Sequence, residues 1–409
     1  MKRLLTWLTA TPLVMMAAAA LLLCCCTAAW LPDSSGFLTI SQRGQVVLFD
    51  LASGKETEIV AGATTPLVGS VAVSPDSQRI AVVQVVMGQG RASALLSLYS
   101  TSGELLHRSE KIPVREEPVQ EAPGQKAKEP YPAIAAVSCW SPDGKRILVC
   151  LFGNQSTVIS YELATQQVER FEDFLPAGMV GVESLPIRAA VPFLPGGEGF
   201  LAIRAPKAGG PGGVAPEFRL FRFSPAMPNR SEPFTYTAAA RERFAPPAVN
   251  ADAAPNATAD AAADAPSGGR VLLPAYWSQG KLRMARHRGT IVVDPETKQV
   301  DYRADAEIET LAAYAERHDV RVVDRLGDDL VVQMNATGRL VEIAERETGK
   351  VRSKVQLDNQ QGVPITVEVA PNRQFLLVSC AVPKPRYWVF DVTGKPIYQG
   401  QVGHTLGRP

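Results

Sequence analysis

The chain has 409 residues, with 42 lysines and arginines against 41 aspartates and glutamates and a formal net charge of +1 at pH 7. This balance excludes a strong overall field for nucleic acid or for an anionic membrane surface, so we expect no nucleic-acid partner. The length fits two or three average domains, or one repeat architecture that uses the whole chain.

The first thirty residues are basic and then apolar. Lys2 and Arg3 precede a stretch whose densest part, residues 13–30, is interrupted only by Thr27. This pattern predicts an export signal or membrane anchor over residues 1–30, with the positive end in the cytoplasm. Three fates stay open: cleavage after the small residues 27–29, retention as an anchor, or lipidation of one of the cysteines 24–26, with Cys24 as the candidate.

A hairpin pattern over residues 135–150 recurs along the rest of the chain. Two apolar runs flank a turn in which proline pre-sets φ, aspartate bonds to nearby amides and glycine closes the turn without steric cost. The closest copy spans residues 71–83. We expect a structural role for the turn residues Ser74, Pro75, Asp76, Ser141, Pro142, Asp143 and Gly144.

Seven copies of this hairpin can be aligned, and a second hairpin follows each of them. Two hairpins in each repeat make four strands, which is the unit of a β-propeller blade. The sequence therefore predicts an all-β fold, a seven-bladed β-propeller of four-stranded blades over residues 31–409. The equivalent first turns are marked by Pro32, Pro75, Pro142, Pro195, Gln279, Gly327 and Pro371.

These markers are 43 to 84 residues apart, and the long steps contain insertions. The insertion at 112–131 is rich in proline and mixed charge. The one at 241–269 is rich in alanine, aspartate and proline, and we expect it to be disordered. Residues 304–318 carry Ile308, Leu311, Ala312 and Ala315 at helical spacing, which predicts a short covering helix between blades.

Two further features bear on the predicted ring. No inner strand precedes Pro32 except the export segment, so we expect the tail, residues 401–406, to supply it and to join the chain ends. Folding the 135–150 hairpin about its turn places Cys150 opposite Ala135, about 13 Å along the strand from Cys139. A disulfide spans at most about 7 Å, so both cysteines are predicted to be small core residues.

The two best copies carry a family resemblance. Ser-Pro-Asp-Gly-Lys-Arg-Ile at 141–147 and Ser-Pro-Asp-Ser-Gln-Arg-Ile at 74–80 resemble the repeat of TolB-type, WD-repeat-like bacterial β-propellers. The other five copies depart from this motif. The resemblance implies a propeller over about residues 31–400 in a periplasmic or envelope protein that binds other proteins.

Catalytic and metal-binding patterns are scarce. None of the four histidines forms a zinc motif with another, and we expect each to be a surface or structural residue; they are His107, His287, His318 and His404. Asp76 and Asp143 recur, but their place after proline in a tight turn explains them. No Gly-x-Ser-x-Gly elbow or phosphate-binding glycine loop with lysine occurs, so the sequence predicts no catalytic residue, metal or cofactor.

Three functional hypotheses remain. The first is a non-enzymatic, envelope-associated scaffold that is exported in a bacterium, held at the membrane by residues 1–30, and binds a protein or cell-envelope component. The second is an exported hydrolase or lactonase with a metal-assisted site at the channel mouth. The third is carbohydrate binding through Trp140, Trp277 and Trp388, although their place in blade strands favours a core role.

Overall fold

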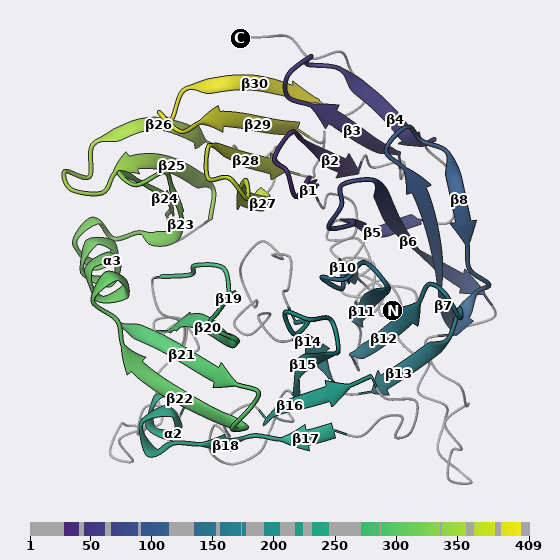
Figure 1. Ribbon diagram of the computed structural model, residues 1–409. Coiled ribbons are helices and arrows are strands. Elements are labelled where there is room, and N and C mark those ends of the chain that lie inside the picture. The colour runs from purple at the N-terminus through teal and green to yellow at the C-terminus, as the bar shows by residue number, and fades with distance from the viewer. Residues whose placement is uncertain are drawn as a thin grey trace, which may run out of the picture.

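The structure is a computed structural model, and its described residues form a ring of seven β-sheets around a central axis (Figure 1). This confirms the predicted seven-bladed β-propeller. The structure describes residues 28–40, 45–61, 67–88, 91–113, 135–152, 156–172, 174–176, 192–204, 217–223, 231–244, 271–286, 288–335, 338–356, 364–380 and 386–401.

Each blade is a meander whose first strand is innermost. Blade 1 contains β1 (Ala28–Trp30), β2 (Gly36–Ile40), β3 (Val46–Asp50) and β4 (Glu56–Val60). Blade 2 contains β5 (Leu67–Val73), β6 (Arg79–Gly88), β7 (Arg91–Ser100), β8 (Leu105–Arg108) and β9 (Ile112–Pro113). Blade 3 contains β10 (Ala135–Trp140), β11 (Arg146–Phe152), β12 (Thr157–Glu162) and β13 (Val168–Glu172). Blade 4 contains β14 (Leu175–Pro176), β15 (Gly199–Arg204), β16 (Glu217–Arg222) and β17 (Ser231–Pro233).

The remaining blades follow the same order. Blade 5 contains β19 (Tyr276–Ser278), β20 (Lys281–Arg286), β21 (Gly289–Asp294) and β22 (Gln299–Ala304), with β18 (Thr235–Tyr236) added outside β22. Blade 6 contains β23 (Arg321–Leu326), β24 (Leu330–Met334), β25 (Leu340–Glu345) and β26 (Val351–Gln356). Blade 7 contains β27 (Pro364–Val369), β28 (Phe375–Cys380), β29 (Arg386–Asp391) and β30 (Pro396–Gln401).

The strands are apolar on both faces because each sheet is packed between two others. In β11, Ile147 and Val149 pack with blade 2, whereas Leu148 and Cys150 pack with blade 4. All four side chains are almost fully buried. Alternate residues of one strand thus serve two different interfaces, which explains the continuous apolar run.

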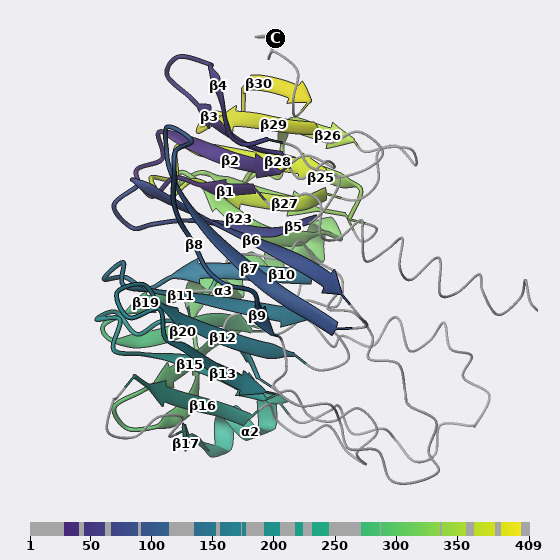
Figure 2. The same ribbon diagram turned by 90° about the vertical axis from the view of Figure 1, so that its right-hand side faces the viewer.

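The seven predicted first turns all join the innermost two strands of their blades. They lie on one face of the ring, hereafter the turn face, which is on the left in Figure 2. In an antiparallel meander the first strand of a blade starts at the opposite face. β1 therefore begins at the face opposite the inner turns.

The ring closes differently from the sequence-based expectation. The innermost strand of blade 1 is β1, residues 28–30, which pairs with β2. Gln401 is the last residue of β30 and belongs to the outermost strand of blade 7, and residues 402–409 lie outside the described part. The propeller thus starts inside the segment assigned to export, because apolar composition alone does not separate a buried strand from a signal segment.

The register of the 135–150 hairpin also differs from the prediction. Ser141 pairs with Arg146, so four residues form the turn and Cys150 lies opposite Val137. Cys139 is therefore a diagonal neighbour of Cys150, with Cα atoms about 7–8 Å apart, and the predicted 13 Å was wrong. Both cysteines are nonetheless free thiols, and burial raises the pKa of Cys139 to about 12.

The described parts of the two insertions contain secondary structure. Residues 112–113 form β9, which pairs with β7, and the rest of the first insertion lies outside the described residues. Helix α2 (Ala238–Phe244) covers the start of the second, because its alanine- and arginine-rich sequence favours a helix. The disorder predicted for residues 241–269 was therefore wrong at 241–244, and residues 245–269 lie outside the described part.

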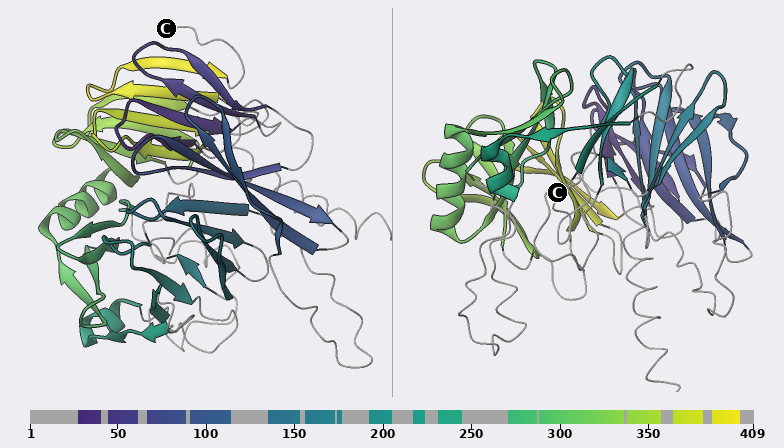
Figure 3. Two further views of the ribbon diagram at one scale, coloured as in Figure 1. Left: turned by 45° about the vertical axis from the view of Figure 1, so that its right-hand side comes forward. Right: turned by 90° about the horizontal axis from the view of Figure 1, so that it is seen from below.

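Two elements connect blades at the circumference. Strand β18 follows β17 of blade 4 and pairs in parallel with β22 of blade 5, so the chain straps these blades together (Figure 1). Helix α3 (Ala306–His318) lies between blades 5 and 6 (Figure 3), and the four residues predicted for its apolar face are buried. Asp305 caps it by accepting from the amides of Glu307 and Ile308.

Candidate functional site

The most regular polar structure is the inner turn of blade 3. Gly144 N donates to Ser141 O at 2.9 Å, and Gly144 adopts a φ of +68° that suits glycine. Asp143 Oδ1 accepts from Ser141 Oγ at 2.6 Å and from Lys145 N at 3.1 Å. Arg146 N donates to Ser141 Oγ at 2.8 Å. The serine and aspartate therefore hold the turn through their own side chains.

Blade 2 repeats this turn. Asp76 Oδ1 accepts from Ser74 Oγ and, at 3.1 Å, from Gln78 N, while Arg79 N donates to Ser74 Oγ at 2.9 Å. Ser77 takes the left-handed position, with φ of +57°. The pattern Ser-Pro-Asp thus specifies the same hydrogen bonds with either glycine or serine at the fourth residue.

These bonds keep both aspartates ionised. The hydrogen bond from Ser74 is the main cause that lowers the pKa of Asp76. Burial opposes ionisation of Asp143, but the hydrogen bonds from Ser141 and Lys145 outweigh it and lower its pKa as well. A carboxylate held in this way is a poor proton donor near neutral pH.

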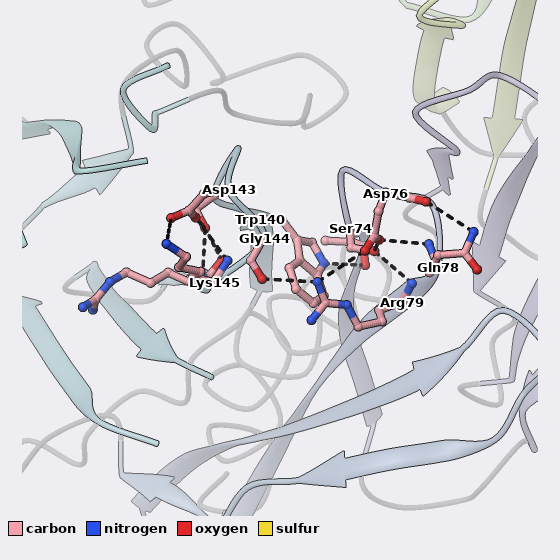
Figure 4. A network of polar contacts seen from close by, with 11 residues as sticks. Ser74, Asp76, Gln78, Arg79, Trp140, Asp143, Gly144 and Lys145 are labelled. Atoms are coloured by element: carbon pink, nitrogen blue, oxygen red, sulfur yellow. Dashed lines mark hydrogen bonds and ion pairs between the residues drawn. The ribbon is translucent and has the colours of Figure 1, made fainter. Parts of the chain in front are cut away.

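Arg79 joins the two turns (Figure 4). Its guanidinium lies 4.9 Å from the ring centroid of Trp140, and its Nη2 donates to Gly144 O at 3.3 Å. The indole Nε1 of Trp140 donates in return to Ala72 O of blade 2 at 3.1 Å. Arg79 and Trp140 thereby connect two blades through stacking and through backbone acceptors.

The same arrangement continues into blade 4. Arg146 lies 4.2 Å from the ring centroid of Phe223 and pairs with Glu162 at 3.0 Å. The Asp143 carboxylate lies so close to Gly197 of the blade 4 turn that an added Cβ would clash with it. The arginine after each Ser-Pro-Asp turn therefore packs on an aromatic ring of the following blade.

Inner turns also touch at the other side of the ring. Gly327 N of blade 6 donates to Arg373 O of blade 7 at 3.2 Å. Asn372 N of blade 7 donates to Ser34 Oγ of blade 1 at 3.0 Å. The inner turns of blades 2, 3 and 4 and those of blades 6, 7 and 1 thus form two runs of contacting turns around the axis.

The other residues considered as candidates lie apart from these turns. Nε2 of His107 lies 2.9 Å from the Tyr161 hydroxyl, and the ring of His318 packs against Tyr314. His287, His404 and Cys24 lie outside the described residues. Within the described ranges, no three side chains of histidine, cysteine, aspartate or glutamate converge as metal ligands would.

The tryptophans lie at blade interfaces. Trp140 and Trp388 are 8% exposed, and Trp277 is half-buried against the core of blades 4 and 5. Sequence reasoning missed Arg79 and Arg146 as bridges between blades. Their signal was an arginine that recurs two residues after each turn and directly before an isoleucine.

Comparison with known proteins does not assign the chain to a family. No protein-family model matches the sequence, and no curated protein matches it. The dihydro-heme d1 dehydrogenase NirN, solved in complex with DHE, is 14% identical with a TM-score of 0.39, over 94% of this chain and 67% of that one. The Cps50 (Swd1) β-propeller domain of Myceliophteria thermophila is 12% identical with a TM-score of 0.46, over 90% and 96%. U3-55K is 9% identical with a TM-score of 0.41, over 87% of each chain. At these scores the strand pairing itself, rather than any likeness, establishes the fold.

No helix within the described ranges has the length and apolar character needed to span a bilayer.

Proposed function

We propose that this protein is a non-catalytic scaffold that binds a protein partner through its turn face. The observation that carries this proposal is the two runs of contacting inner turns. In blades 2 and 3 the recurrent serines and aspartates are engaged in holding the turns. Side chains beside them project to solvent, and the Lys145 side chain is 74% exposed. A rigid, preorganised surface of this kind lowers the entropic cost of binding a partner.

The proposal includes attachment to the cell envelope through the N-terminal segment. The apolar run that follows Lys2 and Arg3 supports export or anchoring. Because Ala28–Trp30 form the inner strand of blade 1, cleavage after Ala29 would remove most of that strand. This favours retention of the segment or processing before Ala28, including lipidation at Cys24. Since β1 starts opposite the inner turns, such an anchor leaves the turn face directed away from the membrane.

Photo-crosslinking in cells tests the partner proposal. A photoreactive residue replaces Lys145 on the turn face of the full-length chain, and in a matched control it replaces Thr57, which is exposed on the outer strand β4. We expect a discrete crosslinked partner from position 145 and a weaker or absent band from position 57. Crosslinks from position 57 alone, or from neither position, would contradict a docking role for the turn face.

Fractionation tests the location separately. Full-length protein is expected in the membrane fraction on the outer side, whereas a chain that lacks residues 1–27 should stay in the cytoplasm. Replacement of Cys24, Cys25 and Cys26 by serine distinguishes the two kinds of anchor. Release from the membrane indicates lipidation, and retention indicates an uncleaved anchor. A soluble cytoplasmic full-length protein would contradict envelope attachment.

A further inference from the structure

Blades 5 and 6 are linked by an extended segment of chain that runs toward the inner turns. Val271 forms a parallel bridge with Val322 of β23, and Leu272 N donates to Val322 O at 2.8 Å. The segment therefore runs along the inner edge of β23 before it enters β19. This direction brings Tyr276, the first residue of β19, toward the end of β23 that carries Arg325.

Two neighbouring turns bring further arginines to the same place. The turn between β23 and β24 donates from Gly327 N to Arg373 O of blade 7 at 3.2 Å. It also accepts at Asp329 O from Arg346 N at 2.8 Å. Burial, followed by the positive charges of Arg373 and Arg346, lowers the pKa of Arg325, so both guanidinium groups act electrostatically on that of Arg325.

Negative charge at this place is unevenly distributed. Arg325 pairs with Glu307, and Asp305 also acts on it electrostatically. Asp328 and Asp329 are exposed on the turn itself. Within the described part of the chain, however, the side chains of Arg346 and Arg373 form no hydrogen bond or ion pair. Two guanidinium groups therefore lie beside a third without a counter-ion of their own.

Arg283 supplies an independent observation. It pairs with Tyr276 across β19 and β20, so both side chains project from the same side of blade 5. Trp277 and Met284 pack on the blade 4 side and Ala285 packs on the blade 6 side, so this side faces blade 6. Nε of Arg283 is buried and has no acceptor among the described residues. A buried guanidinium N–H without an acceptor is costly and commonly indicates an absent water, ion or ligand. Tyr276 beside it is 49% exposed, which leaves its aromatic ring accessible.

We propose that the turn face at blades 5, 6 and 7 holds an oxyanion-binding site for a phosphate or carboxylate group of a ligand. Arg346 and Arg373 supply forked N–H donors from two turns, and Arg283 supplies the buried donor. Tyr276 flanks the site with its ring and hydroxyl. Arginine suits this role because its planar donors match both phosphate and carboxylate oxygens. The site does not depend on the identity of a protein partner.

Isothermal titration calorimetry of the full-length protein at constant ionic strength tests the site. The probes are inorganic phosphate and citrate, with added sodium chloride as the ionic-strength control. We expect saturable binding of at least one probe and about a tenfold weaker Kd in Arg373→Gln and in Arg346→Gln. Arg352→Gln is the matched control, because Arg352 is also half-exposed but already pairs with Glu345. Its affinity should stay within about twofold of the unmodified protein.

Arg283→Lys tests the buried donor, since it keeps the charge and removes Nε. It should weaken binding of the same probe. If that variant fails to fold, the two surface variants still decide the question, because Arg373 lies in an exposed turn. Preference for phosphate or for citrate identifies the ligand group, and either result supports the site. No binding beyond the chloride control, or equal binding by all variants, would overturn it.

Discussion

Tyr387 of blade 7 donates from its hydroxyl to Glu56 Oε1 of blade 1 at 3.0 Å, across 331 positions of the chain. Burial, followed by the charge of Glu56, raises the pKa of Tyr387 well above its ordinary value, so the hydroxyl stays protonated and remains a donor. Nearby, Tyr398 donates to Leu51 O at 2.7 Å. The ring is thus closed by side chains, with each blade built from its own stretch of chain.

Replacement Tyr387→Phe tests this closure. The ring keeps its packing but loses the hydroxyl donor, and we expect the free energy of unfolding to fall by about 1–2 kcal/mol. Urea denaturation measures the change. Glu56→Gln keeps an acceptor for the Tyr387 hydroxyl, so it should lower the free energy of unfolding less than Tyr387→Phe does. An unchanged urea midpoint for Tyr387→Phe would show that this contact does not hold the ring closed.

Trp30 and Trp140 make the same contact at two different interfaces. Trp30 Nε1 donates to Glu368 O at 3.2 Å, and Trp140 Nε1 donates to Ala72 O at 3.1 Å. We expect Trp30→Phe and Trp140→Phe each to lower the free energy of unfolding by about 1–2 kcal/mol, as measured by urea denaturation. Because the two sites share no contacts, the double variant should lose the sum to within about 0.5 kcal/mol. A negligible loss for Trp30→Phe alone would show that the closing interface is weaker than an internal one.

Deletion of the N-terminus tests where the propeller begins. Removal of residues 1–27 should leave Tm nearly unchanged, because β1 is kept. Removal of residues 1–30 also deletes Trp30, which is 8% exposed and packs against Phe37 and Phe375. The loss of a buried tryptophan costs about 3–5 kcal/mol, so Tm should fall by at least about 5 °C. Equal Tm values for the two deletions would exclude β1 as part of the folded ring.

The lowered pKa values of the two turn aspartates predict that the protein loses stability in acid. Folding lowers the pKa of Asp76 and of Asp143 below the ordinary value of 3.8. Their contribution is therefore present above that value and disappears as the pH falls through the lower folded pKa. Solvent screening keeps it near about 0.5 kcal/mol for each group. We expect the double variant Asp76→Asn, Asp143→Asn to lose less stability than the unmodified protein between pH 6 and pH 2.

Urea denaturation at several pH values measures this difference. Glu347→Gln is a suitable control, because this exposed carboxylate lies in an outer turn and should leave the pH profile unchanged. Parallel profiles for the double variant and the unmodified protein would contradict a stabilising role of the ionised turn aspartates.

The features that sequence reasoning predicted correctly depend on neighbouring residues. Ser141, Asp143 and Gly144 lie within one turn, so their hydrogen bonds and the φ of Gly144 follow from local chemistry. The helix near residue 308 follows from its apolar spacing. Seven repetitions of the turn and its flanking strands then specified the number of blades.

The features that sequence reasoning missed depend on contacts between segments that are far apart in the chain. Strand β18 has two residues and no pattern of its own, and it exists because β22 offers an open edge. The arginines at 283, 346 and 373 come from three consecutive blades, so no pattern within one repeat relates them.

The amino-acid sequence by itself determined the repeating blade, because consecutive residues encode each turn and each alternating strand. The tertiary structure decided how the blades join. Arg79 stacks on Trp140 and Tyr387 bonds to Glu56 only after whole sheets have packed. The physical reason is that a turn is stabilised within a few bonds of backbone, whereas an interface gains free energy only when surfaces far apart in the chain leave water together.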